Sequence, residues 1–232
     1  MKTSTLRTTA RNVSGFLFLT LLCWVLFMGL MSSRIHVDWN IQDYLNYAFN
    51  GDILFYMTYT NALLFTLLAS LLFIIIYLVF SKSHPLFATT GILFIPIYAA
   101  FNMVSYGSQC LIIPILQRNY HPDGLSASEM ALFSEWIQMM PGSVIGMING
   151  MGYAILGISS VCFGLILYNE KPGGKIISLL LIANAIACFL GVIGMAADIP
   201  LVDQGVIVGG MLFTLAIPFL IYYFHKTSFN RL

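Results

Sequence analysis

The sequence predicts an all-α membrane protein, a bundle of six transmembrane helices with amphipathic external segments. Charged residues make up 8% of the 232-residue chain and hydrophobic residues 59%, whereas an ordinary soluble domain has about 25% charged residues. The chain also contains six apolar runs, each near or above the roughly 20 residues that a helix needs to cross a bilayer. We therefore expect one integral membrane domain over residues 1–232.

The first span is predicted over residues 14–33, after a basic segment with Lys2, Arg7 and Arg11. A basic start before an apolar run is also typical of a secretory signal peptide. Because this run is longer than the roughly 7–15 residues of a signal core, we favour a helix that stays in the protein. Cleavage near Ser33 is the alternative, and it would leave five spans.

The other five spans are predicted over residues 53–80, 86–116, 143–168, 175–197 and 205–224. The second and third runs exceed the minimum length, so we expect them to tilt, kink or extend past the headgroups. Pro96 and Pro114 fall in the third span and Pro218 in the sixth. Membrane helices tolerate proline where neighbouring groups satisfy the freed carbonyl.

Basic residues indicate the orientation of the bundle. With the N-terminus inside, the external segments hold only Arg34 and Arg118, and the internal segments hold the other eight basic residues: Lys2, Arg7, Arg11, Lys82, Lys171, Lys175, Lys226 and Arg231. Cytoplasmic loops carry an excess of lysine and arginine. We therefore predict a multi-pass protein of the cell membrane with both termini in the cytoplasm. Of the nine acidic residues, only Glu170 falls inside, so the external face should be acidic.

Two external segments have the pattern of helices that lie on the membrane surface. In residues 34–52, apolar and polar side chains alternate at helical spacing. In residues 126–140, Ser126 and Glu129 form a capping box at the start of a helix, and an apolar stripe follows. We predict an interfacial helix over residues 126–140. The simpler interpretation is a lid that packs on the bundle and binds nothing.

Glycine recurs every four residues at the start of the fourth span. Gly142, Gly146 and Gly150 would share one helix face, which lets a neighbouring backbone approach closely. This pattern is typical of helix packing in membranes. We expect these glycines to pack inside the bundle, with oligomerisation as the alternative.

Polar residues within the spans gather in the half of the bundle that faces the external loops. Because an unpaired amide in hydrocarbon costs several kcal/mol, they should point inward. One interpretation is that they join helices by hydrogen bonds. The other is a ligand pocket open to the outside, apolar with a few oriented polar groups. The candidate binding residues are Asn61, Tyr98, Asn102, Ser105, Gln109, Asn149, Tyr153 and Asn184.

Several chemistries lack the residues that they require. No Asp, Glu, Lys, Arg or His lies deep in a predicted span, which argues against a proton-coupled pump or an ion-coupled carrier. The four cysteines form no CxxC pattern. His36 with Asp38 and His121 with Asp123 are read as solvated loop residues rather than metal ligands. We expect no metal, no cofactor, no nucleic acid partner and no catalytic site.

The layout resembles a family of bacterial six-helix membrane proteins classed as a domain of unknown function. The resemblance rests on the start at residues 9–18, on the long first external loop and on residues 163–168 before the fifth span. It implies the six-helix fold, and it implies no catalytic residues.

Three functions remain open at this point. The leading expectation is a non-enzymatic protein that binds or passes a small apolar or amphipathic ligand, such as a lipid, on the outer side. The second is an accessory subunit that docks a protein partner in the bilayer. The third is a lipid-modifying enzyme.

Overall fold

The computed structural model describes residues 3–35, 39–50, 52–118 and 126–229. Within these ranges the chain is helical and contains no strand. Six helical segments are long and apolar enough to cross a membrane, which confirms the predicted six-helix membrane bundle. These are α1 (Thr3–Ser32), α3 (Ile53–Phe80), α4 (Pro85–Arg118), α6 (Val144–Leu167), α7 (Gly174–Ala196) and α9 (Gly205–Phe229), which continues the short α8 (Pro200–Asp203).

The helices follow the predicted spans closely, with extensions where extra turns find partners. α1 begins well before residue 14 because Leu6, Ala10 and Val13 are buried against neighbouring helices. α4 continues through Pro96 and Pro114, and α9 continues through Pro218. Proline therefore does not end these helices, as expected for a membrane bundle.

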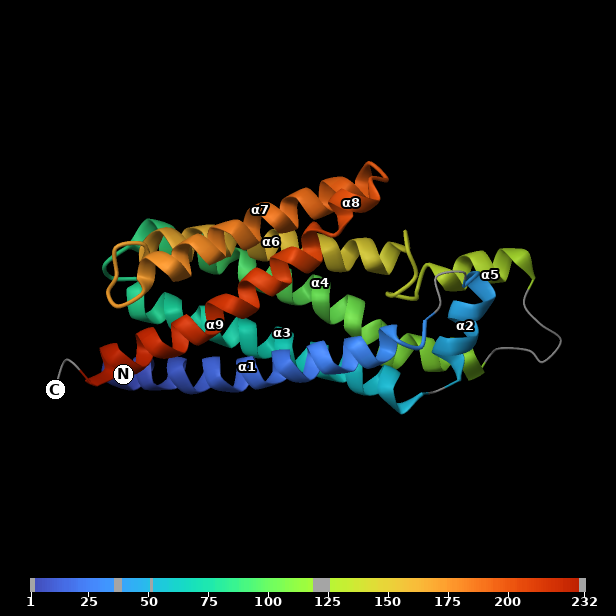
Figure 1. The fold of residues 1–232 in the computed structure, drawn as a ribbon, viewed down its shortest axis with the longest axis horizontal. Coiled ribbons are helices and arrows are strands. Elements are labelled where there is room, and N and C mark those ends of the chain that lie inside the picture. The colour runs from blue at the N-terminus through green and yellow to red at the C-terminus, as the bar shows by residue number, and fades with distance from the viewer. Residues whose placement is uncertain (1–2, 36–38, 51, 119–125, 230–232) are drawn as a thin grey trace.

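The six long helices form a closed ring. Each packs against the next in the order α1, α3, α4, α6, α7, α9, and α9 returns to α1. The first turn of α1 and the last turn of α9 lie at one end, together with the α3–α4 and α6–α7 turns (Figure 1). We call this the terminal end.

Aromatic side chains fill the centre of the ring. Phe73 of α3 lies 5.3 Å from Phe163 of α6 and 6.1 Å from Phe213 of α9, measured between ring centroids. All three rings are nearly or fully buried. Burying a phenylalanine stabilises a fold by about 1.5–3 kcal/mol in water, but in a bilayer the gain comes mainly from close packing. These rings join helices that are not neighbours in the ring.

The opposite end carries a second, smaller core. α2 (Ile41–Phe49) packs against α5 (Ala127–Ser134) and against α4, beyond the ends of α1 and α3 (Figure 1). Capping boxes start both helices, through Asn40 with Asp43 and through Ser126 with Glu129, and the second confirms the sequence prediction. We call α2, α5 and residues 135–143 the cap.

The prediction of one helix over residues 126–140 is wrong in its extent, because α5 ends at Ser134. Two backbone groups beyond this point bind the side-chain amide of Gln109 in α4 rather than continuing the helix. Its Nε2 donates to the carbonyl of Trp136, and its Oε1 accepts from the backbone nitrogen of Gln138. A buried side chain thus holds the segment in turns. Ile137 within it is fully buried.

The three glycines that were predicted to share a packing face lie in different surroundings. Gly142 precedes α6 with φ +76°, and nothing lies within 4 Å of an added Cβ, so it packs against no helix. An added Cβ at Gly146 would contact Ser143 and the Gln138 carbonyl, and one at Gly150 would contact Met195 of α7.

A close backbone approach joins α7 and α9. An added Cβ at Gly191 would stand 2.5 Å from the backbone nitrogen of Val206, and one at Gly205 would collide with the Ala187 carbonyl. Small residues at helix interfaces permit such contact. The pair Gly205-x-x-x-Gly209 is the sequence signal for it.

Replacing Gly191 by alanine should destabilise the α7–α9 pair, because the new Cβ would overlap the Val206 backbone. Overpacking lowers the free energy of unfolding by about 1–3 kcal/mol. Thermal unfolding in detergent would show this loss as a lower Tm. Gly210→Ala is the matched control, since nothing lies within 4 Å of its Cβ. Equal Tm values for the two variants would contradict the close approach.

Candidate functional site

A chain of amide side chains connects three helices and the cap. Asn149 of α6 donates through Nδ2 to Oδ1 of Asn102 in α4, over 2.8 Å. Oδ1 of Asn149 accepts from Nε2 of Gln138 in the cap, over 3.3 Å. The hydroxyl of Tyr59 in α3 donates to Oε1 of Gln138, over 3.0 Å. Gln138 therefore links α3 and α6 through one side chain.

The backbone supplies the remaining partners of these amides. Nδ2 of Asn102 donates to the Tyr98 carbonyl one turn earlier, over 3.1 Å. Ser105 donates to the carbonyl of Ile145 in α6, over 3.2 Å. Gln109 binds the backbone of Trp136 and Gln138 as described above. Asn102, Ser105 and Gln109 are fully buried and Asn149 is 6% exposed.

Four of the eight predicted binding residues thus join one network through their side chains, whereas Tyr98 joins it only through its backbone carbonyl. Asn61 is half-buried and donates to the Thr20 carbonyl of α1, over 2.9 Å. Asn184 of α7 is buried and accepts from the thiol of Cys188. The hydroxyl oxygens of Tyr153 and Tyr106 lie 2.7 Å apart. Tyr98 packs against the ring of Tyr153, and its buried hydroxyl has no hydrogen-bond partner.

Sequence reasoning missed Gln138 and Gly152. Gln138 was counted within an interfacial helix, although a glutamine between Ile137 and two methionines is out of place on an apolar stripe. Gly152 allows the Asn102 amide to sit against α6, because an added Cβ at Gly152 would collide with Nδ2 of Asn102. Neither residue belongs to a sequence motif that predicts its contacts.

An ionic contact stands at the base of the cap. Arg34, after α1, pairs with the carboxylate of Asp52, whose Oδ1 also accepts from the backbone nitrogen of Leu54 at the start of α3. Burial raises the pKa of Tyr47 in α2 above its ordinary value. The Asp52 carboxylate adds to the rise and the Arg34 guanidinium opposes it. Tyr47 therefore stays neutral at physiological pH.

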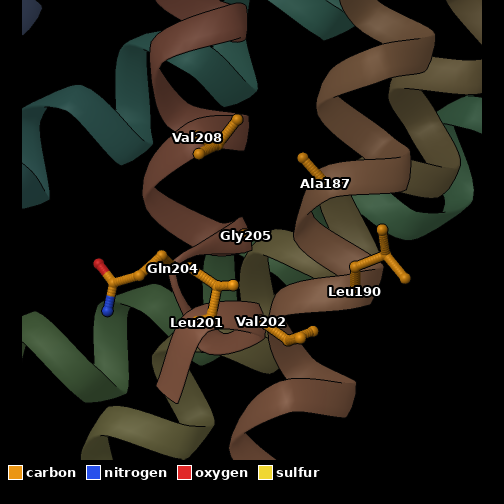
Figure 2. Close-up of a pocket in the computed structure, with 7 residues that line it drawn as sticks. All are labelled: Ala187, Leu190, Leu201, Val202, Gln204, Gly205 and Val208. Atoms are coloured by element: carbon orange, nitrogen blue, oxygen red, sulfur yellow. The ribbon is translucent and has the colours of Figure 1, made fainter. Parts of the chain in front are cut away.

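The structure also contains an open hollow between α7, α8 and α9, of about 270 Å³ (Figure 2). It is lined by Ala187, Leu190, Leu201, Val202, Gln204, Gly205 and Val208. Leu190, Leu201 and Val208 are 50%, 86% and 47% exposed. Gly205 and Ala187 lie in the hollow among larger apolar side chains. This hollow involves none of the predicted binding residues.

The described residues include no group of three or more His, Cys, Asp or Glu placed to hold a metal ion. His36 with Asp38 and His121 with Asp123 lie outside the described residues. The arrangement as described offers hydrogen bonding and an apolar surface.

Comparisons with protein-family models, with curated proteins and with solved structures give no match. The resemblance to six-helix bacterial membrane proteins therefore stays a prediction, and the candidate site is interpreted from its own geometry.

Replacing Gln109 by leucine should destabilise the protein by about 1–3 kcal/mol, because buried backbone groups of Trp136 and Gln138 lose their partner. Thermal unfolding in detergent measures the loss, and hydrogen exchange over residues 135–143 should rise. Asn61→Leu is the control, since it removes one hydrogen bond between α3 and α1, worth about 0.6 kcal/mol on average. Unchanged exchange in Gln109→Leu would show that the amide does not hold the cap.

Proposed function

We propose that this multi-pass membrane protein binds a lipid-like apolar or amphipathic ligand at the hollow between α7, α8 and α9. The observation that carries the proposal is the hollow itself, in which Gly205 and Ala187 lie among exposed apolar side chains. Small-molecule sites are concave and mostly apolar, with a few polar groups that orient the ligand.

The chemistry of the walls favours an acyl chain. Leu190, Leu201 and Val208 present only hydrocarbon, and Gln204 lies at the edge of the hollow with its amide pointing away from Leu190 and Ala187 (Figure 2). The amide of Gln204 also donates to its neighbour Asp203, so a polar edge borders the apolar floor. An amphipathic molecule matches both parts, with its chain along the floor and its polar group toward Gln204.

The buried amides argue against the earlier expectation that the ligand lies among Asn102, Gln109 and Asn149. Their side-chain donors and acceptors are engaged by one another, by Gln138 or by the backbone. A ligand there would have to displace hydrogen bonds in a low-dielectric interior, where unpaired groups are costly. We therefore propose that the ligand binds at the α7–α8–α9 hollow and that the amides hold the cap in place.

Filling the hollow tests this proposal. Phosphatidylcholine with a photoreactive acyl chain should label residues 187–208 of the wild type more strongly than the rest of the lipid-exposed surface. Ala187→Phe should reduce this labelling to the general level, because the new ring occupies the hollow. The matched control is Ile186→Phe, which adds a ring to an exposed side chain outside the hollow. Mapping uses protease digestion and mass spectrometry. Even labelling of the wild-type surface would overturn the proposal.

A second candidate is an accessory role in which the cap docks a protein partner. The observation that favours it is the firm attachment of the cap through Gln109 and Gln138, since a preorganised surface loses little entropy on binding. Leu132 of α5 is 59% exposed on the cap. Loss of a stoichiometric co-purifying protein in Leu132→Glu, with retention in Leu93→Glu on lipid-exposed α4, would support docking. The third candidate, a lipid-modifying enzyme, has no observation in its favour.

We also propose that the terminal end faces the cytoplasm. Of the described basic residues, Arg7, Arg11, Lys82, Lys171, Lys175 and Lys226 belong to this end, where the termini and short turns meet (Figure 1). Cytoplasmic loops of membrane proteins carry an excess of lysine and arginine. In a background without native cysteines, a membrane-impermeant maleimide should label Leu132→Cys in intact cells and Lys226→Cys only after permeabilisation. The reverse pattern would invert the topology.

A further inference from the structure

Arg7 is a buried cation near the start of α1. Its side chain is 7% exposed, and Nη1 donates to the carbonyl of Thr227 in the last turn of α9, over 3.0 Å. Carbonyl groups at a helix C-terminus carry partial negative charge and attract a guanidinium. The contact therefore ties the two ends of the chain together at the terminal end of the bundle.

Among the described residues, this guanidinium has no counterion of the kind that a buried charge needs. Its Nε is buried without a hydrogen-bond partner. Among the described residues the ion pair found is Arg34 with Asp52, at the far end of α1, so no described carboxylate pairs with Arg7. Glu170, the acidic residue of the terminal end, accepts instead from the hydroxyl of Tyr223, over 2.9 Å. A charge buried without a partner is costly unless an anion joins it.

The surroundings of Arg7 are cationic and suit the headgroup layer. Arg11 follows one turn later on the same face of α1, where its Nε and Nη2 both donate to Oδ1 of Asn12. Exposed Lys226 precedes the residue that Arg7 binds. α1 has 30 residues, about 45 Å of helix at 1.5 Å per residue, whereas the hydrocarbon core is about 30 Å thick. Its first turns therefore reach the phosphate level of a bilayer.

We propose that Arg7, flanked by Arg11 and Lys226, binds the phosphate of an anionic phospholipid headgroup. A guanidinium presents its donors as a planar fork that matches two phosphate oxygens. Because Nη1 is engaged by Thr227 and Nε is covered by protein, Nη2 is the donor through which a phosphate would reach the guanidinium. The two flanking cations favour a lipid with net negative charge over a zwitterionic one. This site lies at the opposite end from the α7–α8–α9 hollow and does not depend on it.

Native mass spectrometry of the detergent-purified protein tests the site with phosphatidylglycerol, phosphatidylcholine and inorganic phosphate as separate probes. The wild type should retain one phosphatidylglycerol at low lipid ratios and gain Tm from it, with little effect of phosphatidylcholine. Arg7→Gln should bind phosphatidylglycerol about ten- to a hundredfold more weakly, the range expected for a lost charged hydrogen bond. Lys82→Gln is the matched control, because it removes one exposed charge from another turn of the same end.

Three results would overturn the proposal. They are equal retention of the two lipids by the wild type, undiminished phosphatidylglycerol binding in Arg7→Gln, and an equal loss in Lys82→Gln. Saturation by inorganic phosphate alone, with no further gain from the lipid, would replace the headgroup by a free anion and would also reject it. If Arg7→Gln does not fold, two other measurements test the proposal. One is the shift in wild-type Tm with each of the three probes. The other is the Arg7→Lys variant, which keeps the charge but loses the fork.

Discussion

The structure depends on one constraint, that a polar group inside hydrocarbon must find its partner within the protein. Helices satisfy the backbone, and the amides of α4 and α6 satisfy one another. The same requirement shapes the cap, because Gln109 pairs with backbone groups of residues 136 and 138 that no helix satisfies. An irregular segment can therefore lie at the end of the bundle, where Ile137 and Ser143 are buried and side-chain amides satisfy its backbone.

The helices of the ring also pack through a second kind of contact. Where polar pairs join α4 with α6 and the cap, glycines join α7 with α9 and let their backbones touch. Glycine contributes no side-chain hydrogen bond, so this interface relies on van der Waals contact. The hollow between α7, α8 and α9 lies beside this interface and is lined by Gly205 and Ala187. Gly205 thus belongs both to the close pairing of these helices and to the site proposed for a ligand.

The two ends of the molecule differ in chemistry. The cap end combines an apolar core with acidic caps such as Asp43 and Glu129, whose carboxylates are used to start helices. The terminal end combines basic side chains with a buried guanidinium that holds α1 to α9. This difference in charge is the basis for the proposed orientation and for the proposed preference for an anionic lipid. Lipid contact is therefore the theme that both proposals share, through an acyl chain at one end and a phosphate at the other.

Hydrophobicity alone determined the six spans, because each run must match the thickness of the bilayer, and the helix over residues 53–80 has the predicted bounds. The capping box at Ser126 and Glu129 could also be predicted, since it involves neighbours in the chain.

Tertiary structure decided which polar residues meet. Asn102 and Asn149 are separated by 47 positions, and nothing local indicates that Asn184 bonds elsewhere. It also decided where α5 ends, because Gln109, a residue of another helix, supplies the competing hydrogen bonds. The length of a span is a property of one segment of the sequence. The hydrogen-bond partner of a polar side chain depends instead on which helix faces the ring brings together.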